Sequence, residues 1–361
     1  MGVASPHGEQ DVERYGRLLD EAQAIKGISL AKDAWRRLRR NRVAMISLWF
    51  LVLLSLVTFL TPLLPLQAPK QVDTIRAFSP PTWSTAGSID ANQVDAHFGA
   101  QNAFNSLLLQ GRLLLFDDWA LPSLCGTDEL GRDLLSRLFW GARIALVVGI
   151  VATLVSLVIG VTYGAVSGYL GGAVDNLMMR IVDVLYSIPF IFVVIFLITI
   201  LSEKSIKARL SDYGIDRITI FFFVVGAIYW LTMARVVRGQ VISLKNEQFI
   251  EAARTIGAGR ARIIFRHLVP NVSSVVIVYL TLTIPRVMLF EAFLSFLGLG
   301  VQPPDVSWGL LANAGFKVIT PVKIYWWLIV FPGLALGTTL FALNFLGDGL
   351  RDALDPKLKN W

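Results

Sequence analysis

The sequence is poor in charge and in cysteine. Charged residues make up only 16% of the 361 residues, against roughly 25% in globular proteins. So few charges cannot cover a water-facing surface, which excludes an ordinary cytosolic enzyme. The 55% apolar fraction excludes a disordered chain as well. The single cysteine, Cys125, allows no internal disulfide and no thiolate metal cluster.

The motifs of ATP hydrolysis and metal catalysis are also missing. No Gly-Lys dipeptide occurs, so the phosphate-binding G-x-x-x-x-G-K-[ST] loop is absent. His7, His97 and His267 are scattered outside the apolar runs, so no histidine pair for a membrane metalloprotease exists and a membrane serine protease lacks its histidine. We therefore expect no catalytic residue, metal or cofactor in this chain, and an energy source that lies elsewhere.

Long uncharged runs are what the sequence has in abundance. About 20 apolar residues cross the hydrocarbon core of a bilayer, and we predict six such spans, which makes the chain an all-α integral membrane protein. Only about the first 20 residues of the second run need to span. The runs are 43–66, 144–174, 184–202, 218–234, 272–299 and 324–347.

The distribution of basic residues predicts the orientation. Six spans place the tails 1–42 and 347–361 on one side, where the connecting segments hold 20 basic and 12 acidic residues, against 12 of each on the other side. Because basic residues are retained in the cytoplasm, we expect both termini there and the segment 67–143 outside. Clusters at Lys32–Arg42 and Arg235–Arg266 then face lipid headgroups, which explains the positive charge better than nucleic acid does.

Three charges lie within or beside the spans. Asp183 is three residues after Arg180, which favours an ion pair at the interface. Arg286 and Glu291 would point about 140° apart on an ideal helix, so a direct pair would need a distortion that Pro285 can supply. Alternatively, the two charges face a partner subunit or a water-filled pathway. An ion-coupled carrier, which usually keeps acidic residues at this depth, stays a competing class.

The extracytoplasmic segment 126–146 has an amphipathic pattern. As a helix it would place leucines on one stripe and charges on the other, with Thr127 or Asp128 as the N-cap. We interpret it as an interfacial helix that leads into the second span. In the alternative interpretation its charges bind substrate or a partner.

The cytoplasmic segment 246–270 has the pattern of a helix, a bend and a second short helix. Asn246 is a plausible N-cap, two glycines beginning at Gly257 allow a sharp bend, and Pro270 ends the second helix. Small residues on the first helix permit close approach of another surface. From these features alone, a docking element and a solvated basic loop are equally good interpretations.

The residues of this segment also resemble a known motif, the EAA loop of the membrane subunits of binding-protein-dependent ABC importers. The resemblance implies that the coupling loop 240–270 inserts into a groove of an ATPase subunit and that its proline sets the angle of the following span. The residues that carry it are Glu251, Ala252, Ala253, Arg254, Gly257, His267 and Pro270.

Further matches cover nearly all of the chain. GTDELGRDLLSR at 126–137, WRRLRRNRVA at 35–44, SGYLGGAVDNLMMR at 167–180, FEAFLSFLGLG at 290–300 and GDGLRDALDPK at 347–357 resemble the C-type subunits of the dipeptide and oligopeptide (OppC/DppC-like) branch. The sequence departs from that pattern at 67–125, at 202–217 and at Arg286, which leaves the choice of substrate open.

Membership of that branch would imply a type I ABC importer permease fold in the bacterial inner membrane, with a five-helix core at 144–346. The implied partners are a B-type permease subunit in a heterodimer, two ABC ATPase subunits that use ATP and Mg, and an extracytoplasmic peptide-binding protein. The implied cargo is an oligopeptide or dipeptide. A nickel complex, glutathione or an antimicrobial peptide stays open, as does a membrane scaffold without transport.

The remaining candidates lie near the two membrane surfaces. We expect Gly298, Gly300 and Trp308 at an outer gate or at the contact with the binding protein, alongside Arg286 and Glu291 as pathway candidates. The alternative is an ordinary interfacial loop with an aromatic anchor. The tail from Asp348 to Lys357 is either a second ATPase contact or a solvated tail.

Overall fold

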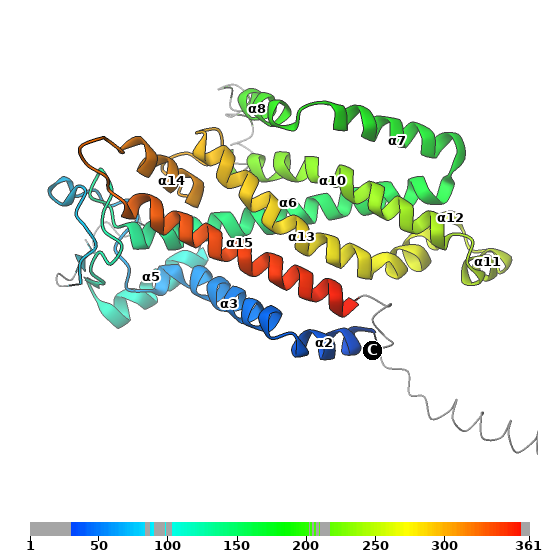
Figure 1. Ribbon diagram of the computed structural model, residues 1–361, viewed down its shortest axis with the longest axis horizontal. Helices are drawn as coiled ribbons and strands as arrows, with labels where there is room; N and C mark the ends of the chain where they lie inside the picture. Colours follow the sequence, from blue (N-terminus) through cyan, green and yellow to red (C-terminus); the bar gives the residue numbers. More distant parts are fainter. Residues whose placement is uncertain are drawn as a thin grey trace, which may run out of the picture.

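Long helices running side by side dominate the architecture (Figure 1). The computed structural model describes residues 30–83, 87–89, 98, 103–201, 203, 206, 209 and 217–354. Within these residues the predicted all-α class is confirmed, since β structure is limited to one pair of two-residue strands and an isolated bridge between Thr127 and Asp133. The helix α11 lies at one end of the molecule, whereas α14 lies toward the other (Figure 1).

The elements follow in chain order. They are α2 (Leu30–Arg40), α3 (Arg42–Phe59), η1 (Thr61–Leu63), η2 (Thr74–Arg76), β1 (Gly87–Ser88), α5 (Ala103–Phe116), β2 (Trp119–Ala120), α6 (Leu134–Leu170), α7 (Gly172–Ser187), α8 (Phe190–Leu201), α10 (Arg217–Leu244), α11 (Gln248–Thr255), α12 (Arg260–Arg262), the π-helical η4 (Ile263–Leu268), α13 (Val269–Phe296), α14 (Trp308–Lys317) and α15 (Trp327–Leu354).

Five of the described helices are long and apolar enough to cross a membrane, and the bent pair α7–α8 gives a sixth if it counts as one span. The predicted third span, 184–202, is therefore not one straight helix. The two halves meet at an angle of 84°. Pro189 explains the break, because proline removes an N–H donor and disfavours helical geometry at the preceding residue, Ile188.

Other span boundaries also differ from prediction. The first span ends at Phe59 rather than at residue 66, because the chain turns into the 3₁₀ helix that contains Pro62. The second begins at Leu134 rather than at residue 144 and runs for 37 residues. It ends at Gly171, whose φ of +66° suits glycine.

Helices α6 and α10 pack closely at the centre of the bundle. Gly160, Gly164 and Gly168 recur at four-residue spacing on the side of α6 that faces α10. A Cβ atom built on Gly164 would lie 2.3 Å from the backbone oxygen of Ala234 on α10. Small residues that let two backbones approach are the usual device for packing helices in a membrane.

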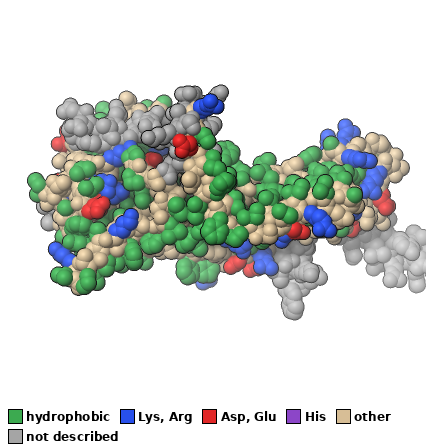
Figure 2. Space-filling view, turned by 90° about the horizontal axis from the view of Figure 1, so that it is seen from above, with side chains coloured by type: hydrophobic (Ala, Val, Ile, Leu, Met, Phe, Trp, Pro, Cys, Tyr) green, Lys and Arg blue, Asp and Glu red, His purple; other side chains and the backbone are tan. Residues whose placement is uncertain are grey.

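The outward surface of the bundle is apolar, as expected of a lipid-facing protein. On α3, Ile46 and Trp49 are 70% and 66% exposed, while the small residues Ala44 and Ser47 are buried. Hydrophobic side chains likewise cover much of the face drawn in Figure 2. Large apolar side chains therefore face outward and small ones inward, the reverse of a soluble core.

The segment between the first two spans folds around its own small core. Strands β1 and β2 pair antiparallel, and the buried Arg112 of α5 donates to the backbone oxygens of Leu64 (3.1 Å), Leu66 (3.2 Å) and Trp119 (3.2 Å). Burial lowers the pKa of Arg112. The apolar members of this core are Ala68, Ile89, Phe98, Leu109 and Ala120.

Candidate functional site

The segment 246–270 contains the predicted helix and bend. The first helix, α11, lies at one end of the bundle (Figure 1). Its N-cap is Glu247 and not Asn246, and the cap forms no side-chain hydrogen bond. After the helix, Gly257 adopts a φ of +82°. This left-handed conformation disfavours other residues, so the glycine is what permits the sharp turn.

The second helix does not stop at Pro270, contrary to the prediction. The chain stays helical from Arg260 to Phe296, through α12, the π-helical η4 and α13. Pro270 lies in the first turn of α13, where a missing backbone N–H is tolerated. His267 belongs to the π-helical turn, and its backbone oxygen accepts a hydrogen bond from Asn271 at 2.7 Å.

Helix α11 has one face in the core and one face in the open. Ile250 and Ala253 are buried against the start of the fifth span, whereas Glu251 and Ala252 are exposed. The exposed side also carries Ile256, which is 85% exposed. Together with Phe249, which is 40% exposed, Ile256 adds apolar surface to this exposed side.

Arg254, a predicted ATPase contact, touches its own chain in this structure. Its guanidinium lies 5.5 Å from the ring centroid of Tyr169, at the end of α6. It also donates to the backbone oxygen of Lys245 at 3.4 Å, and Lys245 in turn donates to the oxygen of Gly168 at 3.1 Å. These contacts tie α11 to the ends of α6 and α10.

A polar cluster that sequence reasoning missed lies between α6, α7 and α10, near the residues that hold α11. Arg238 on α10 donates two hydrogen bonds of 2.6 Å to the carboxylate of Asp175 on α7, which also accepts one from Ser167 on α6. Asp175 and Arg238 are 63 positions apart, so no local pattern reveals the cluster. Together they join three helices directly behind the loop.

Glu291, a candidate for the pathway, lies inside the helix bundle in this structure. Its side chain is fully buried and accepts a 2.6 Å hydrogen bond from Ser295. Ser295 in turn accepts from the backbone N–H of Val301 at 2.9 Å. A Cβ atom built on Gly300 would lie 2.3 Å from the Ser295 hydroxyl. In this structure Gly300 therefore allows the turn after α13 to pack closely against Ser295.

Trp308 is likewise not at the surface. It is 2% exposed, and its indole N–H donates to the backbone oxygen of Leu138 on α6 at 3.0 Å. It is therefore neither an interfacial anchor nor a contact for a binding protein in this conformation. Gly298, by contrast, is exposed, has a φ of +76° and has open space around it.

Arg286 is exposed on α13 and, among the described residues, forms no ion pair with Glu291 or any other acid. Its backbone oxygen accepts from the Tyr229 hydroxyl of α10 at 3.3 Å. Asp183 pairs with Arg235 at 2.7 Å and not with Arg180.

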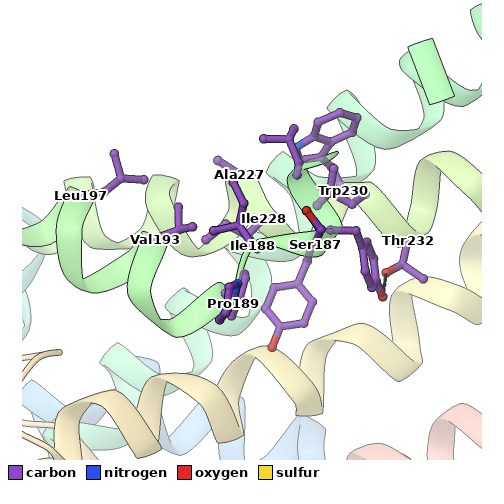
Figure 3. A pocket seen from close by; sticks show the side chains of 14 residues that line it. Ser187, Ile188, Pro189, Val193, Leu197, Ala227, Ile228, Trp230 and Thr232 are labelled. Carbon is purple, nitrogen blue, oxygen red and sulfur yellow. Dashed lines mark hydrogen bonds between the residues drawn. The ribbon is translucent and has the colours of Figure 1, made fainter. Parts of the chain in front are cut away.

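A pocket of about 480 Å³ lies between α10 and the break of α7–α8 (Figure 3).

The segment 126–137 is not the predicted interfacial helix. Residues 126–133 form a tight turn, and the helix begins only at Leu134, with Asp133 as its N-cap. Asp128 closes the turn by accepting from the backbone N–H groups of Leu130 (2.9 Å) and Arg132 (3.0 Å). The segment is therefore compact and cannot lie along the membrane surface as a helix.

The charges of this turn are mostly buried. The Asp128 carboxylate, 3% exposed, pairs with Arg132 at 2.8 Å and with Arg137, which is 4% exposed. The backbone oxygen of Thr127 accepts from the Trp327 indole of α15 at 3.2 Å. Burial raises the pKa of the neighbouring Asp133 to about 6. These contacts hold the turn, α6 and α15 together, so the charges are not free to bind a substrate.

The C-terminal part of α15 packs against the start of α3. Gly349 of α15 contacts Ala44 of α3 so closely that a Cβ atom built on the glycine would lie 2.4 Å from the Ala44 Cβ. Helix α15 ends at Leu354, and residues 355–357 of the predicted tail contact lie outside the described residues. Asp348 itself is exposed.

Comparison with known proteins gives matches over nearly the whole chain. The family described as "Binding-protein-dependent transport system inner membrane component" matches residues 160–360, and "N-terminal TM domain of oligopeptide transport permease C" matches residues 29–81. The oligopeptide transport system permease protein OppC of Haemophilus influenzae is 41% identical, covering 96% of this chain and 94% of the relative. The dipeptide transport system permease protein DppC of Bacillus subtilis is 38% identical, covering 94% and 90%.

A solved structure of the MetNI methionine ABC transporter also matches. The TM-score is 0.46 at 19% sequence identity, covering 60% of this chain and 94% of that chain.

Proposed function

The chain belongs to the family of binding-protein-dependent transport system inner membrane components, and from that premise we propose that it is the permease subunit of an ATP-driven importer of oligopeptides or dipeptides. Its multiple apolar helices and its relatives make it a multi-pass inner-membrane protein. The peptide cargo comes from the names of full-length relatives that are 38% and 41% identical.

The proposed assembly contains this chain, a B-type permease subunit, two ATPase subunits and an extracytoplasmic peptide-binding protein. ATP and Mg bind to the ATPase subunits, and this chain has no catalytic role. Both termini and α11 lie in the cytoplasm, and the type I permease architecture is part of the proposal. Helices α2 and α11 and the last turn of α15 lie in the same half of the molecule, away from α14 (Figure 1), which supports one common side for them.

In this proposal α11 is the coupling helix. Glu251, Ala252 and the turn at Gly257 contact the ATPase, while Ile250 and Ala253 fasten the helix to the permease. Closure of the ATPase dimer moves α11 as a body and, through it, the attached ends of α6 and α10. The resulting tilt opens the cavity between the two permease subunits. The single observation that carries this role is the exposed small-residue and apolar face of α11.

Ala252 offers the sharpest test because it is exposed, so a larger side chain there disturbs docking but not the fold. We expect Ala252→Trp to insert normally, to lose co-purification with the ATPase and to lower ATP-dependent peptide uptake at least tenfold. Ala252→Ser, which keeps the residue small, serves as the matched control. Normal uptake by a stably expressed Ala252→Trp variant would refute the docking role.

The competing class of ion-coupled carrier makes a different prediction. It requires transport by the purified chain alone in vesicles under an ion gradient, with Glu291 as the decisive charge. The burial of Glu291 against Ser295 gives this class no support in the structure. Peptide uptake unchanged in a strain without this chain would instead indicate a scaffold.

A further inference from the structure

One face of the bundle has a line of polar side chains at depths where lipid-facing helices are apolar. We call it the polar track, and its members come from α7, α10 and α13. They are Asp183, Tyr186, Tyr229, Thr232, Arg235 and Arg286.

Three contacts lie along the track. The Tyr229 hydroxyl donates to the backbone oxygen of Arg286 at 3.3 Å. Thr232, three residues further along α10, lies 3.3 Å from the Tyr186 hydroxyl, and these side chains approach each other in Figure 3. Arg235, again three residues further, lies 4.4 Å over the ring of Tyr186. The three-residue spacing of Tyr229, Thr232 and Arg235 places these contacts along one side of α10.

Arg286 lies deep within the span. It is ten residues from the outer end of α13 at Phe296, which at 1.5 Å per residue is about 15 Å. Tyr229 is ten residues from the outer end of the fourth span at Thr219, so it lies at the same depth. This is about half of the roughly 30 Å hydrocarbon core. A charge at that depth must face water, a partner or a ligand rather than lipid.

The charges of the track lie at different depths. The Asp183–Arg235 ion pair is 65% and 41% exposed, and Arg235 lies 16 residues from Thr219, about 24 Å, near the cytoplasmic surface, where water reaches an ion pair. The track has two arginines and one aspartate, so its net charge is positive. Arg235 is paired with Asp183, whereas the guanidinium of Arg286 forms no hydrogen bond or ion pair with any residue that the structure describes. The unpaired positive charge is therefore that of Arg286.

We infer that Arg286 binds a carboxylate of the peptide cargo, in the first place its C-terminal carboxylate, during passage through the importer. Arginine is suited to this because its planar guanidinium can bind a carboxylate through two parallel hydrogen bonds. Tyr229, whose hydroxyl donates to the backbone oxygen of Arg286, also lines a pocket of about 480 Å³. The tyrosine and threonine hydroxyls of the track supply further partners for the polar groups of a peptide. This inference rests on the proposed function.

The test uses the complete importer in membrane vesicles with an Arg286→Cys variant. The only native cysteine, Cys125, is 8% exposed, and burial together with the nearby Asp133 raises its pKa to about 12. A thiol so protected reacts slowly with methanethiosulfonates, and the unsubstituted importer measures any background. Two reagents of similar size then place either an ethylammonium or an ethylsulfonate group at position 286.

We expect uptake of tri-alanine, whose only carboxylate is C-terminal, to fall about tenfold in Arg286→Cys. The ethylammonium adduct should restore uptake to within about threefold of the parent, and the ethylsulfonate adduct should not. Arg286→Lys should retain most of the uptake. Arg36→Gln, which removes an exposed charge from α2, should behave as the parent does.

Three results would overturn the inference. The first is that the thiol introduced by Arg286→Cys does not react in the assembled importer, which would place the position against the partner subunit or lipid. The second is that both adducts restore uptake equally. The third is that the variant loses its permease partner on purification, which would assign the charge to the subunit interface. Absence of any peptide uptake by the unsubstituted importer would instead overturn the proposed function, and thiol modification remains measurable in that case.

Discussion

Replacement of Asp128 by asparagine tests whether the 126–137 segment stabilises the fold by joining the turn to α6 and α15. The carboxylate is 3% exposed and pairs with Arg132 and with Arg137, itself 4% exposed. Asparagine keeps an oxygen for the backbone N–H groups but replaces the charged oxygen by an amide. Arg137 then stays buried without its counter-ion, which typically costs about 3 to 5 kcal/mol.

We therefore expect Asp128→Asn to lower the free energy of unfolding by about 3 kcal/mol. The measurement is denaturant unfolding of the detergent-solubilised chain. Glu129→Gln is the matched control, because it removes the same charge one residue later at an exposed position and should change stability by less than about 0.5 kcal/mol. Adding Arg137→Met to Asp128→Asn should restore about 1 to 3 kcal/mol, since the uncompensated cation is removed.

Uptake per assembled importer separates this role from substrate binding. If Asp128 only fastens the turn, the variant importers that do assemble should transport at the parental rate. Unfolding free energies that do not differ between Asp128→Asn and Glu129→Gln would refute the reasoning. Normal stability with lost transport would equally refute it, because the carboxylate would then act on the cargo or a partner.

Three further predictions follow from buried groups. Burial raises the pKa of Asp133 from 3.8 to about 6, so the folded chain holds a proton that the unfolded chain releases, and its stability should fall by about 3 kcal/mol as the pH rises from about 4 to 6. Asp133→Asn, which can still cap Ser136, should show no such fall and be more stable at pH 7; equal pH profiles of melting temperature would contradict this. Arg112→Met leaves three backbone oxygens without their charged donor and should unfold the 67–125 segment locally, seen as faster proteolysis there but not in the helices. Gly164→Val forces α6 away from α10 and should cut the yield of folded protein severalfold, whereas Gly333→Ala, with open space around it, should not.

The number and class of the spans could be predicted because a span must satisfy its own backbone hydrogen bonds within a long apolar run. The residues at which the helices begin and end could not be predicted. Helix α6 begins ten residues before the uncharged run, since Arg137 is buried against Asp128 instead of marking a polar boundary. Helix α13 continues through Pro270 because a π-helical turn precedes it. Hydropathy alone predicts neither the start of α6 nor the continuation of the helix through Pro270.

The bend of the coupling loop is visible in the sequence, since two closely spaced glycines have few other uses there. The partners of the charges are not. Helical spacing pairs Asp183 with Arg180, a neighbour on its own helix, but its partner Arg235 lies 52 positions away. The sequence places Trp308 at the surface, but its indole bonds to α6 across 170 positions. Local spacing identifies which residues are unusual, whereas long-range packing decides what they contact.

Helix α10 links the two parts of the proposed mechanism. At its inner end, Lys245 and Arg238 join α10 to the end of α6 and to α7, directly behind α11. In its middle it carries Tyr229 and Arg235 of the polar track. A helix of 28 residues packed through glycines against α6 moves as one rigid body. In the proposed mechanism, a displacement of α11 by the ATPase would shift the track through α10, so that one helix joins the residues proposed to receive the force to those proposed to face the cargo.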